Sequence, residues 1–186
     1  MRLISSFALA LSILAFTTGC STTGGTIDTA SAEKIQLQAD ASLKSLYART
    51  PIARDLAKKA AGILIFPGII KAGFIGGADY GKGVLKVAGK NAGYYNFVAG
   101  SFGLQAGAQA YDSILFFMNK KDLKALDDAK GFEIGVGPTV VALDAGAAKN
   151  LTTTTGRADV YSFILNQRGL MGGLNLQGSK ISRITP

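Results

Sequence analysis

The segment Gly62–Gln109 constrains the fold of this chain more than any other part of the sequence. Glycine recurs throughout it, interleaved with β-branched and aromatic residues, and the segment holds neither histidine nor cysteine. Glycine weakens helices and strands through backbone entropy, so it persists mainly where backbones bend sharply, pack closely or approach a ligand. The segment therefore predicts a compact, curved β structure that binds something, and it does not resemble a catalytic pocket.

The first residues have the pattern of an export signal. Arg2 precedes an uncharged apolar run, Leu3–Phe16, and small residues follow up to Gly19. A charged start, an apolar centre and a small-residue cleavage site are typical of a secretory signal peptide. The apolar run is shorter than the roughly 20 residues that a membrane-spanning helix needs, and an uncleaved anchor is the alternative. We therefore predict a signal peptide over residues 1–19.

Cys20 is the only cysteine of the chain and directly follows Gly19. This arrangement resembles the bacterial lipoprotein signal, in which the cysteine is lipidated and becomes the mature N-terminus. The alternative is an incidental cysteine in a soluble exported protein, but a lone exposed thiol is a liability in an oxidising compartment. We expect lipid attachment at Cys20, a flexible tether over residues 20–30 and one domain over residues 31–186. Ser21 resembles a sorting signal for the outer membrane, so the domain is expected to face the periplasm.

Three helices are predicted from capping residues and apolar spacing. Ser31 caps the first, which runs to about residue 47 with apolar side chains at helical spacing. Thr50-Pro51 starts the second, because proline suits the first helical position, and Gly62 ends it. Asn119 caps the third, which runs to about residue 129.

Short apolar runs separated by turn residues predict strands in the rest of the chain. The expected turns are Pro67-Gly68, Tyr80-Gly81-Lys82, Gly89-Lys90-Asn91 and Asn166-Gln167-Arg168-Gly169. The expected strands are 63–66, 73–79, 83–88, 93–99, 102–108, 113–118, 134–142, 161–165 and 170–176. Many short strands with a few helices predict an α+β domain, with N-terminal helices packed on an antiparallel, glycine-rich, barrel-like sheet.

Histidine and a free cysteine are missing from the predicted mature sequence, and the carboxylates are scattered, with no spacing that suggests an acid–base pair. There is no histidine, which removes the commonest general base and metal ligand, and lipidation occupies the one thiol. Gly76–Lys82 fits the start of a phosphate loop, but Gly83 stands where that loop needs a hydroxyl residue, and a strand-like run follows. Ser101 lies in Ala-Gly-Ser-Phe-Gly, which is no nucleophile motif. We therefore predict no enzyme activity, no cofactor and no metal site.

Basic residues are the remaining candidates for function. The formal net charge is +8, and such an excess favours anionic partners such as lipid headgroups, anionic glycans or nucleic acid. Export makes nucleic acid the least suitable of these. Near a bilayer each cation is worth about 1 kcal/mol, and Ile69 and Ile70 are expected either to enter the interface or to belong to the core. The basic candidates around the glycine-rich segment are Lys58, Lys59, Lys71, Lys82, Lys86 and Lys90.

Several segments together resemble the SYLF-domain family. They are Gly62–Pro67, Lys71–Phe74, Gly76–Leu85, Ser101–Gln109 and Arg168–Leu174, and the resemblance covers about residues 31–185. It implies lipid binding, because eukaryotic members occur in adaptor proteins of cortical actin patches and bind phosphoinositides. Neither actin nor phosphoinositides suit a chain exported from a bacterial cell, so anionic phospholipids are the lipids we expect.

In that family, lipid binding is associated with basic residues of the N-terminal helical region. The resemblance therefore adds Lys34, Lys44 and Arg54 to Lys58, Lys59, Lys71 and Lys82 as candidates for contact with lipid headgroups. The resulting prediction is a non-enzymatic lipoprotein of the bacterial envelope whose domain binds anionic membrane lipids. The alternative is a structural lipoprotein that binds an envelope protein and no specific lipid.

Overall fold

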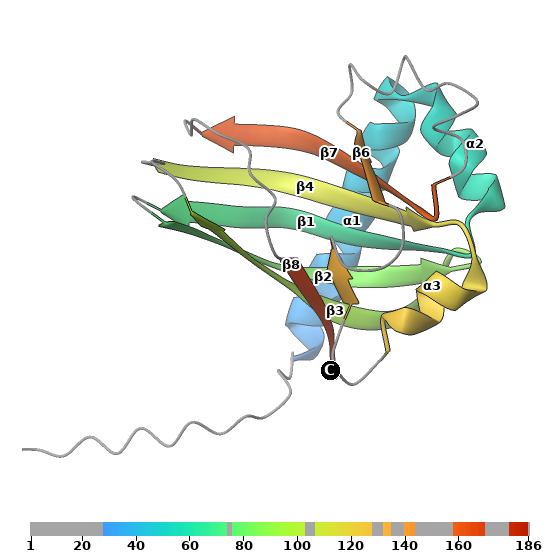
Figure 1. The fold of residues 1–186 in the computed structure, drawn as a ribbon. Helices are drawn as coiled ribbons and strands as arrows, with labels where there is room; N and C mark the ends of the chain where they lie inside the picture. The colour runs from blue at the N-terminus through green and yellow to red at the C-terminus, as the bar shows by residue number, and fades with distance from the viewer. Residues whose placement is uncertain are drawn as a thin grey trace, which may run out of the picture.

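A computed structural model of the chain confirms an α+β domain in which helices pack on one sheet (Figure 1). It describes residues 28–73, 76–102, 107–127, 132–134, 140–143, 158–169 and 179–185. The predicted signal peptide, Cys20 and most of the predicted tether lie outside the described residues. Every described helix and strand lies between residues 28 and 185, so a chain that begins at Ser21 keeps all of the contacts given below.

Two helices precede the sheet. They are α1, Thr29–Arg49, and α2, Pro51–Lys59. Asp28 caps α1 in place of Ser31, because the Asp28 carboxylate accepts a hydrogen bond from the Ser31 backbone N–H at 2.8 Å. The predicted start of the second helix at Pro51 is confirmed. The predicted end is wrong, since α2 stops at Lys59 and Gly62 already begins the first strand.

Eight strands form a single sheet in the order β5-β8-β3-β2-β1-β4-β7-β6. Their bounds are β1 Gly62–Gly73, β2 Gly76–Val87, β3 Lys90–Phe102, β4 Gly107–Phe117, β5 Phe132–Ile134, β6 Val140–Leu143, β7 Val160–Gly169 and β8 Ser179–Ile184. Neighbouring strands are antiparallel except β6 and β7, which are parallel. Because β5 and β6 are its two edges, the described sheet is open and twisted and does not close into the barrel-like form that we expected (Figure 1).

The central strands are longer than the sequence pattern predicted. Pro67-Gly68 does not end the first strand: β1 continues past it with a bulge between Phe66 and Ile69. A bulge removes the need for the hydrogen bond that proline lacks, so the strand survives it. The predicted turn Tyr80-Gly81-Lys82 is also wrong, since these residues pair with Val98, Phe97 and Asn96 in the middle of β2.

The later part of the chain contains two further corrections. The expected strand 134–142 is split, with Ile134 in β5 and Val140 in β6, at opposite edges of the sheet. The expected turn at Asn166 is wrong because β7 continues to Gly169, with Asn166 taking a φ of 56° inside the strand. The expected strand 170–176 lies outside the described residues.

Two other local predictions, a helix cap and a turn, agree with the structure more closely. Asn119 caps α3, Lys120–Ala125, by accepting a hydrogen bond from the Asp122 backbone N–H at 2.9 Å, as predicted. The helix is shorter than expected. The turn between β2 and β3 is centred on Ala88 and Gly89, both with positive φ, close to the predicted Gly89-Lys90-Asn91.

The centre of the sheet is buried on both faces, which explains its continuous apolar runs. The first cluster lies under α1 and α2 and includes Ile35, Leu46, Ile65, Ile114 and Phe116. The second cluster lies on the other face, beside α3, and includes Leu64, Phe66, Leu115, Phe117 and Leu126. A strand with alternate residues in two cores has no polar face, so its sequence reads as an unbroken apolar stretch.

Glycines of β2 allow the second cluster to pack directly against the backbone. A Cβ atom at Gly83 would lie 2.4 Å from Cδ1 of Phe66, and one at Gly81 would lie 2.7 Å from Cγ1 of Ile69. Side chains of β1 therefore occupy the space that a larger residue on β2 would need. The close backbone packing that the glycine-rich segment predicted is present here.

Candidate functional site

Lys44 and Arg54 come together at the corner where α1 meets α2. They line a hollow of about 430 Å³ with Asp40, Leu43, Tyr47 and Ala48, which we call the α1–α2 hollow. Among the described residues neither Lys44 nor Arg54 forms an ion pair. The hollow thus combines two exposed cations with one carboxylate, Asp40, and two half-buried side chains, Leu43 and Tyr47.

A second hollow, of about 340 Å³, adjoins the first and shares Leu43 and Tyr47 with it. Lys58 of α2 and Lys86 of β2 both line it. Each has an acidic partner: Lys58 donates to Asp55 at 2.9 Å, and Lys86 contacts Asp40. The positive charges of these two lysines are therefore partly balanced by neighbouring carboxylates, whereas Lys44 and Arg54 form no ion pair among the described residues.

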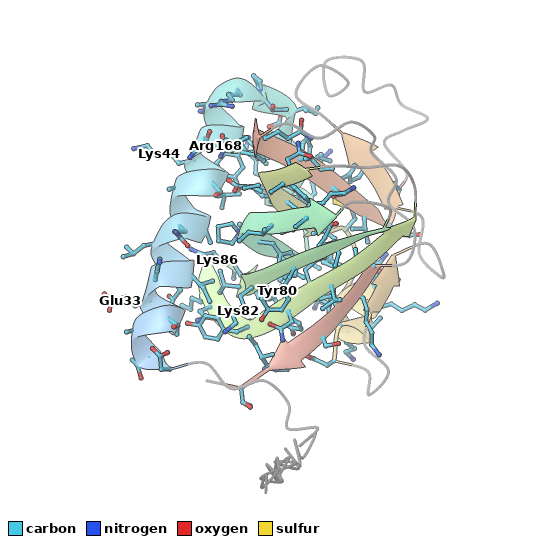
Figure 2. The ribbon with its side chains drawn as sticks, turned by 90° about the vertical axis from the view of Figure 1, so that its left-hand side faces the viewer. Glu33, Lys44, Tyr80, Lys82, Lys86 and Arg168 are labelled. Atoms are coloured by element: carbon cyan, nitrogen blue, oxygen red, sulfur yellow. The ribbon has the colours of Figure 1, made fainter. Side chains whose placement is uncertain are left out.

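The other predicted contacts do not join this corner. Lys34 and Lys59 are exposed but line neither hollow. Lys34 precedes Lys44 by ten positions on α1, a rise of about 15 Å along the helix. Lys82 is half-buried in β2, on the face of the sheet that also carries α1 (Figure 2).

Lys71 was wrongly predicted to be a surface contact. Its side chain is only 3% exposed, and strand alternation puts it on the face of Ile69, in the second cluster. It pairs in register with Asp79, which is also buried and accepts a hydrogen bond from the Tyr111 hydroxyl at 2.7 Å. Burial, and then the bond to Asp79, raises the pKa of Tyr111 above its usual range. Lys71 is therefore part of a buried polar group and does not meet a partner at the surface.

A third hollow, of about 310 Å³, lies between α1 and a line of strand irregularities, and we call it the bulge hollow. Asp112 is one of its lining residues. The Asp112 carboxylate accepts hydrogen bonds from Ser42 Oγ at 2.7 Å, Gly68 N at 2.8 Å and Asn166 Nδ2 at 2.6 Å. One carboxylate thus ties α1 to the bulge in β1 and to the positive-φ residue of β7. Arg168 and Gln38 also line this hollow.

Sequence reasoning missed one basic cluster. Lys120, Lys121 and Lys124 are exposed on α3 and line a hollow of about 460 Å³ with Ala125. Their spacing along a predicted helix, at positions i, i+1 and i+4, was the available signal. The cluster lies beside the second core cluster, across the sheet from α1 and α2.

The described residues carry no group of three Asp, Glu, Cys or His side chains placed to hold a metal ion. None of the described helices is long and apolar enough to cross a membrane. The α1–α2 hollow and the hollow beside α3 are each lined by two or more basic side chains, which suit contact with anions at a surface.

Residues 98–185 match the family model described as Ysc84: Las17-binding protein actin regulator. The match begins within β3 and continues through β8, so it includes Ser101–Gln109 and Arg168–Leu174, two of the segments that carry the resemblance. Lys44 and Arg54 precede the matched residues. A comparison with curated proteins found no match.

Proposed function

Because this chain belongs to the SYLF-domain family, we propose that it is an exported, lipid-anchored protein whose domain binds anionic phospholipids without catalysing a reaction. The observation that carries this proposal is the α1–α2 hollow, which Lys44 and Arg54 line together with Leu43 and Tyr47. Cations beside apolar side chains suit the boundary between headgroups and acyl chains. The partners named in the family description, Las17 and actin, do not suit a chain exported from a bacterial cell.

The lipid anchor and the α1–α2 hollow would strengthen each other's attachment to the membrane. Each cation near an anionic surface contributes only about 1 kcal/mol, so the hollow by itself gives weak attachment. A lipid on Cys20 would hold the domain at the membrane surface and raise its effective concentration there. Described structure begins at residue 28, so only a short segment separates Cys20 from α1. The anchor and the headgroup contact therefore act as two signals for one membrane.

The anchor predicts a specific covalent modification. In bacteria fed an alkyne analogue of palmitate, the full chain should incorporate the label and fractionate with membranes. Cys20→Ser should remove the label, because the chain has no other cysteine. Equal labelling of the Cys20→Ser variant would contradict lipidation at this position.

The headgroup contact predicts a loss of vesicle binding on neutralising the hollow. In a chain begun at Ser21, Lys44→Ala with Arg54→Ala should weaken binding to phosphatidylglycerol-containing vesicles roughly thirtyfold, because two surface contacts of about 1 kcal/mol are lost. Flotation of vesicles with bound protein measures this. The matched control is Lys120→Ala with Lys121→Ala, which removes the same charge from α3 and should change binding far less. Equal losses in the two double variants would contradict the assignment to the α1–α2 hollow and leave only a net-charge effect.

A further inference from the structure

Three large apolar side chains form an exposed row across the sheet. Ile70 of β1, Tyr80 of β2 and Val98 of β3 are 58%, 48% and 49% exposed. Ile70 is paired in register with Tyr80, and Tyr80 with Val98, so all three project from the same face. We call this set the apolar row.

The residues next to the row are small, so their side chains do not cover the side chains of the row. Ala72, Ala78 and Gly100, which pair with one another across the same strands, are all exposed. An apolar patch rimmed by polar residues is typical of a surface that contacts a protein or a membrane. The row therefore projects above an otherwise flat part of the sheet.

The row continues in register to a cation on each side. On one side Ala110 of β4 pairs with Ile70, and Arg168 of β7 pairs with Ala110. On the other side Lys180 of β8 pairs with Val98, and β5 continues the register with Glu133.

The two cations lie far apart. With strands about 4.8 Å apart, Arg168 and Lys180 are separated by about 24 Å across the sheet. Both are exposed, and Lys82 follows Tyr80 on the same face (Figure 2).

Among the described helices, α1 packs on this face without covering the row. The helix lies on the same face but over the other part of the strands, where Gln36 bonds the Tyr94 hydroxyl and Ser42 bonds Asp112. Tyr94 and Val98 are four residues apart on β3, about 13 Å. The helix therefore stands beside the row, and the bulge hollow, lined by Ala41 and Arg168, lies between them.

We infer that the apolar row is a second membrane contact, one that lies at the headgroup–acyl boundary of an anionic bilayer while Arg168, Lys82 and Lys180 meet its headgroups. This inference rests on the proposed function and adds a surface to it. Tyrosine is enriched at that boundary, and aliphatic side chains beside cations are typical of surfaces that lie on anionic membranes. A second copy fits less well, because it would bring Arg168, Lys82 and Lys180 against identical cations.

The row is also continuous with the α1–α2 hollow. Ala41 lines the bulge hollow beside Arg168, and Lys44, less than one helical turn further along α1, lines the α1–α2 hollow. Figure 2 shows Lys44 and Arg168 near the same end of α1. The row and the α1–α2 hollow therefore lie on neighbouring parts of the same side of the domain.

A polarity-sensitive probe at the row tests this inference. A chain begun at Ser21 contains no cysteine, so Val98→Cys provides one site for a nitrobenzoxadiazole label. With phosphatidylglycerol-containing vesicles, the label should shift to shorter wavelength and be quenched by brominated acyl chains. The matched control is Lys121→Cys on α3, across the sheet, where neither change is expected.

A pair of substitutions provides the second readout. Ile70→Ser with Val98→Ser should weaken vesicle binding roughly tenfold, because the exposed parts of two aliphatic side chains lose their apolar environment. If the protein floats with the vesicles but the label at position 98 shows neither the wavelength shift nor the quenching, this inference is wrong and the proposed function is unaffected. A probe that shifts with protein concentration in the absence of vesicles would overturn the inference in favour of a second copy. Absence of flotation by the unsubstituted chain would overturn both proposals.

Discussion

Asp112→Ala is expected to lower the free energy of unfolding by about 3 kcal/mol, one of the two largest effects we predict. The substitution removes the acceptor for three donors that lie on three different elements: Ser42 on α1, Gly68 on β1 and Asn166 on β7. Asp112 is only 8% exposed, so water does not freely replace the lost bonds. Urea unfolding followed by circular dichroism measures the loss.

The control for this substitution is Asp55→Ala. Asp55 is exposed and pairs with Lys58 within one helix, so its loss should change stability by no more than about 0.5 kcal/mol. Asp112→Asn should lie between the two, since its single amide oxygen still accepts from some of the donors. Equal stability of the Asp112→Ala and Asp55→Ala variants would show that the carboxylate does not hold the bulge to α1.

Gly83→Ala is the second substitution with a large expected effect. The added Cβ would lie 2.4 Å from Cδ1 of Phe66 and 2.5 Å from the backbone oxygen of Ile65, so both the side chain and the strand backbone must move. Overpacking of this kind costs about 1–3 kcal/mol, and a backbone contact places the cost toward the upper end. The expected result is a lower urea midpoint with an unchanged slope.

Gly100→Ala is the matched control on the neighbouring strand. No atom lies within 4 Å of the position that its Cβ would take. Its stability should therefore stay within about 0.5 kcal/mol of the unsubstituted chain. If the Gly83 and Gly100 variants lost stability equally, the cause would be a general preference for glycine in these strands, and close packing at Gly83 would be excluded.

The sequence was informative wherever one local interaction decides the structure. Proline at the first position of α2 and the Asn119 cap of α3 act within a few residues, and both predictions are confirmed. Pro67-Gly68 and Tyr80-Gly81-Lys82 failed because the same residues suit a turn, a bulge or a close strand contact. The choice among these three structures depends on pairing with strands that are distant in the sequence, such as β4 and β3.

The candidate site likewise combines residues that the sequence could identify with an arrangement that depends on contacts between distant segments. Charge and the helical region pointed to Lys44 and Arg54, but only the packing of α2 against α1 brings them to one hollow. Lys71 was misplaced because β1 was expected to end at residue 66; continued to Gly73, its alternation puts Lys71 beside Ile69 inside the fold. The apolar row comes from three strands, and only the register aligns Ile70, Tyr80 and Val98.

Vesicle flotation of the chain begun at Ser21 measures whether this domain itself binds anionic bilayers. Removing the segment that contains Cys20 excludes attachment through a lipid, so only the folded domain is measured. We expect binding to vesicles that contain phosphatidylglycerol, little binding to pure phosphatidylcholine, and a decline in binding as salt screens the surface cations. Equal binding to both vesicles at every salt concentration, or no binding to either, would contradict this expectation, and the absence of binding would favour an envelope lipoprotein with a protein partner.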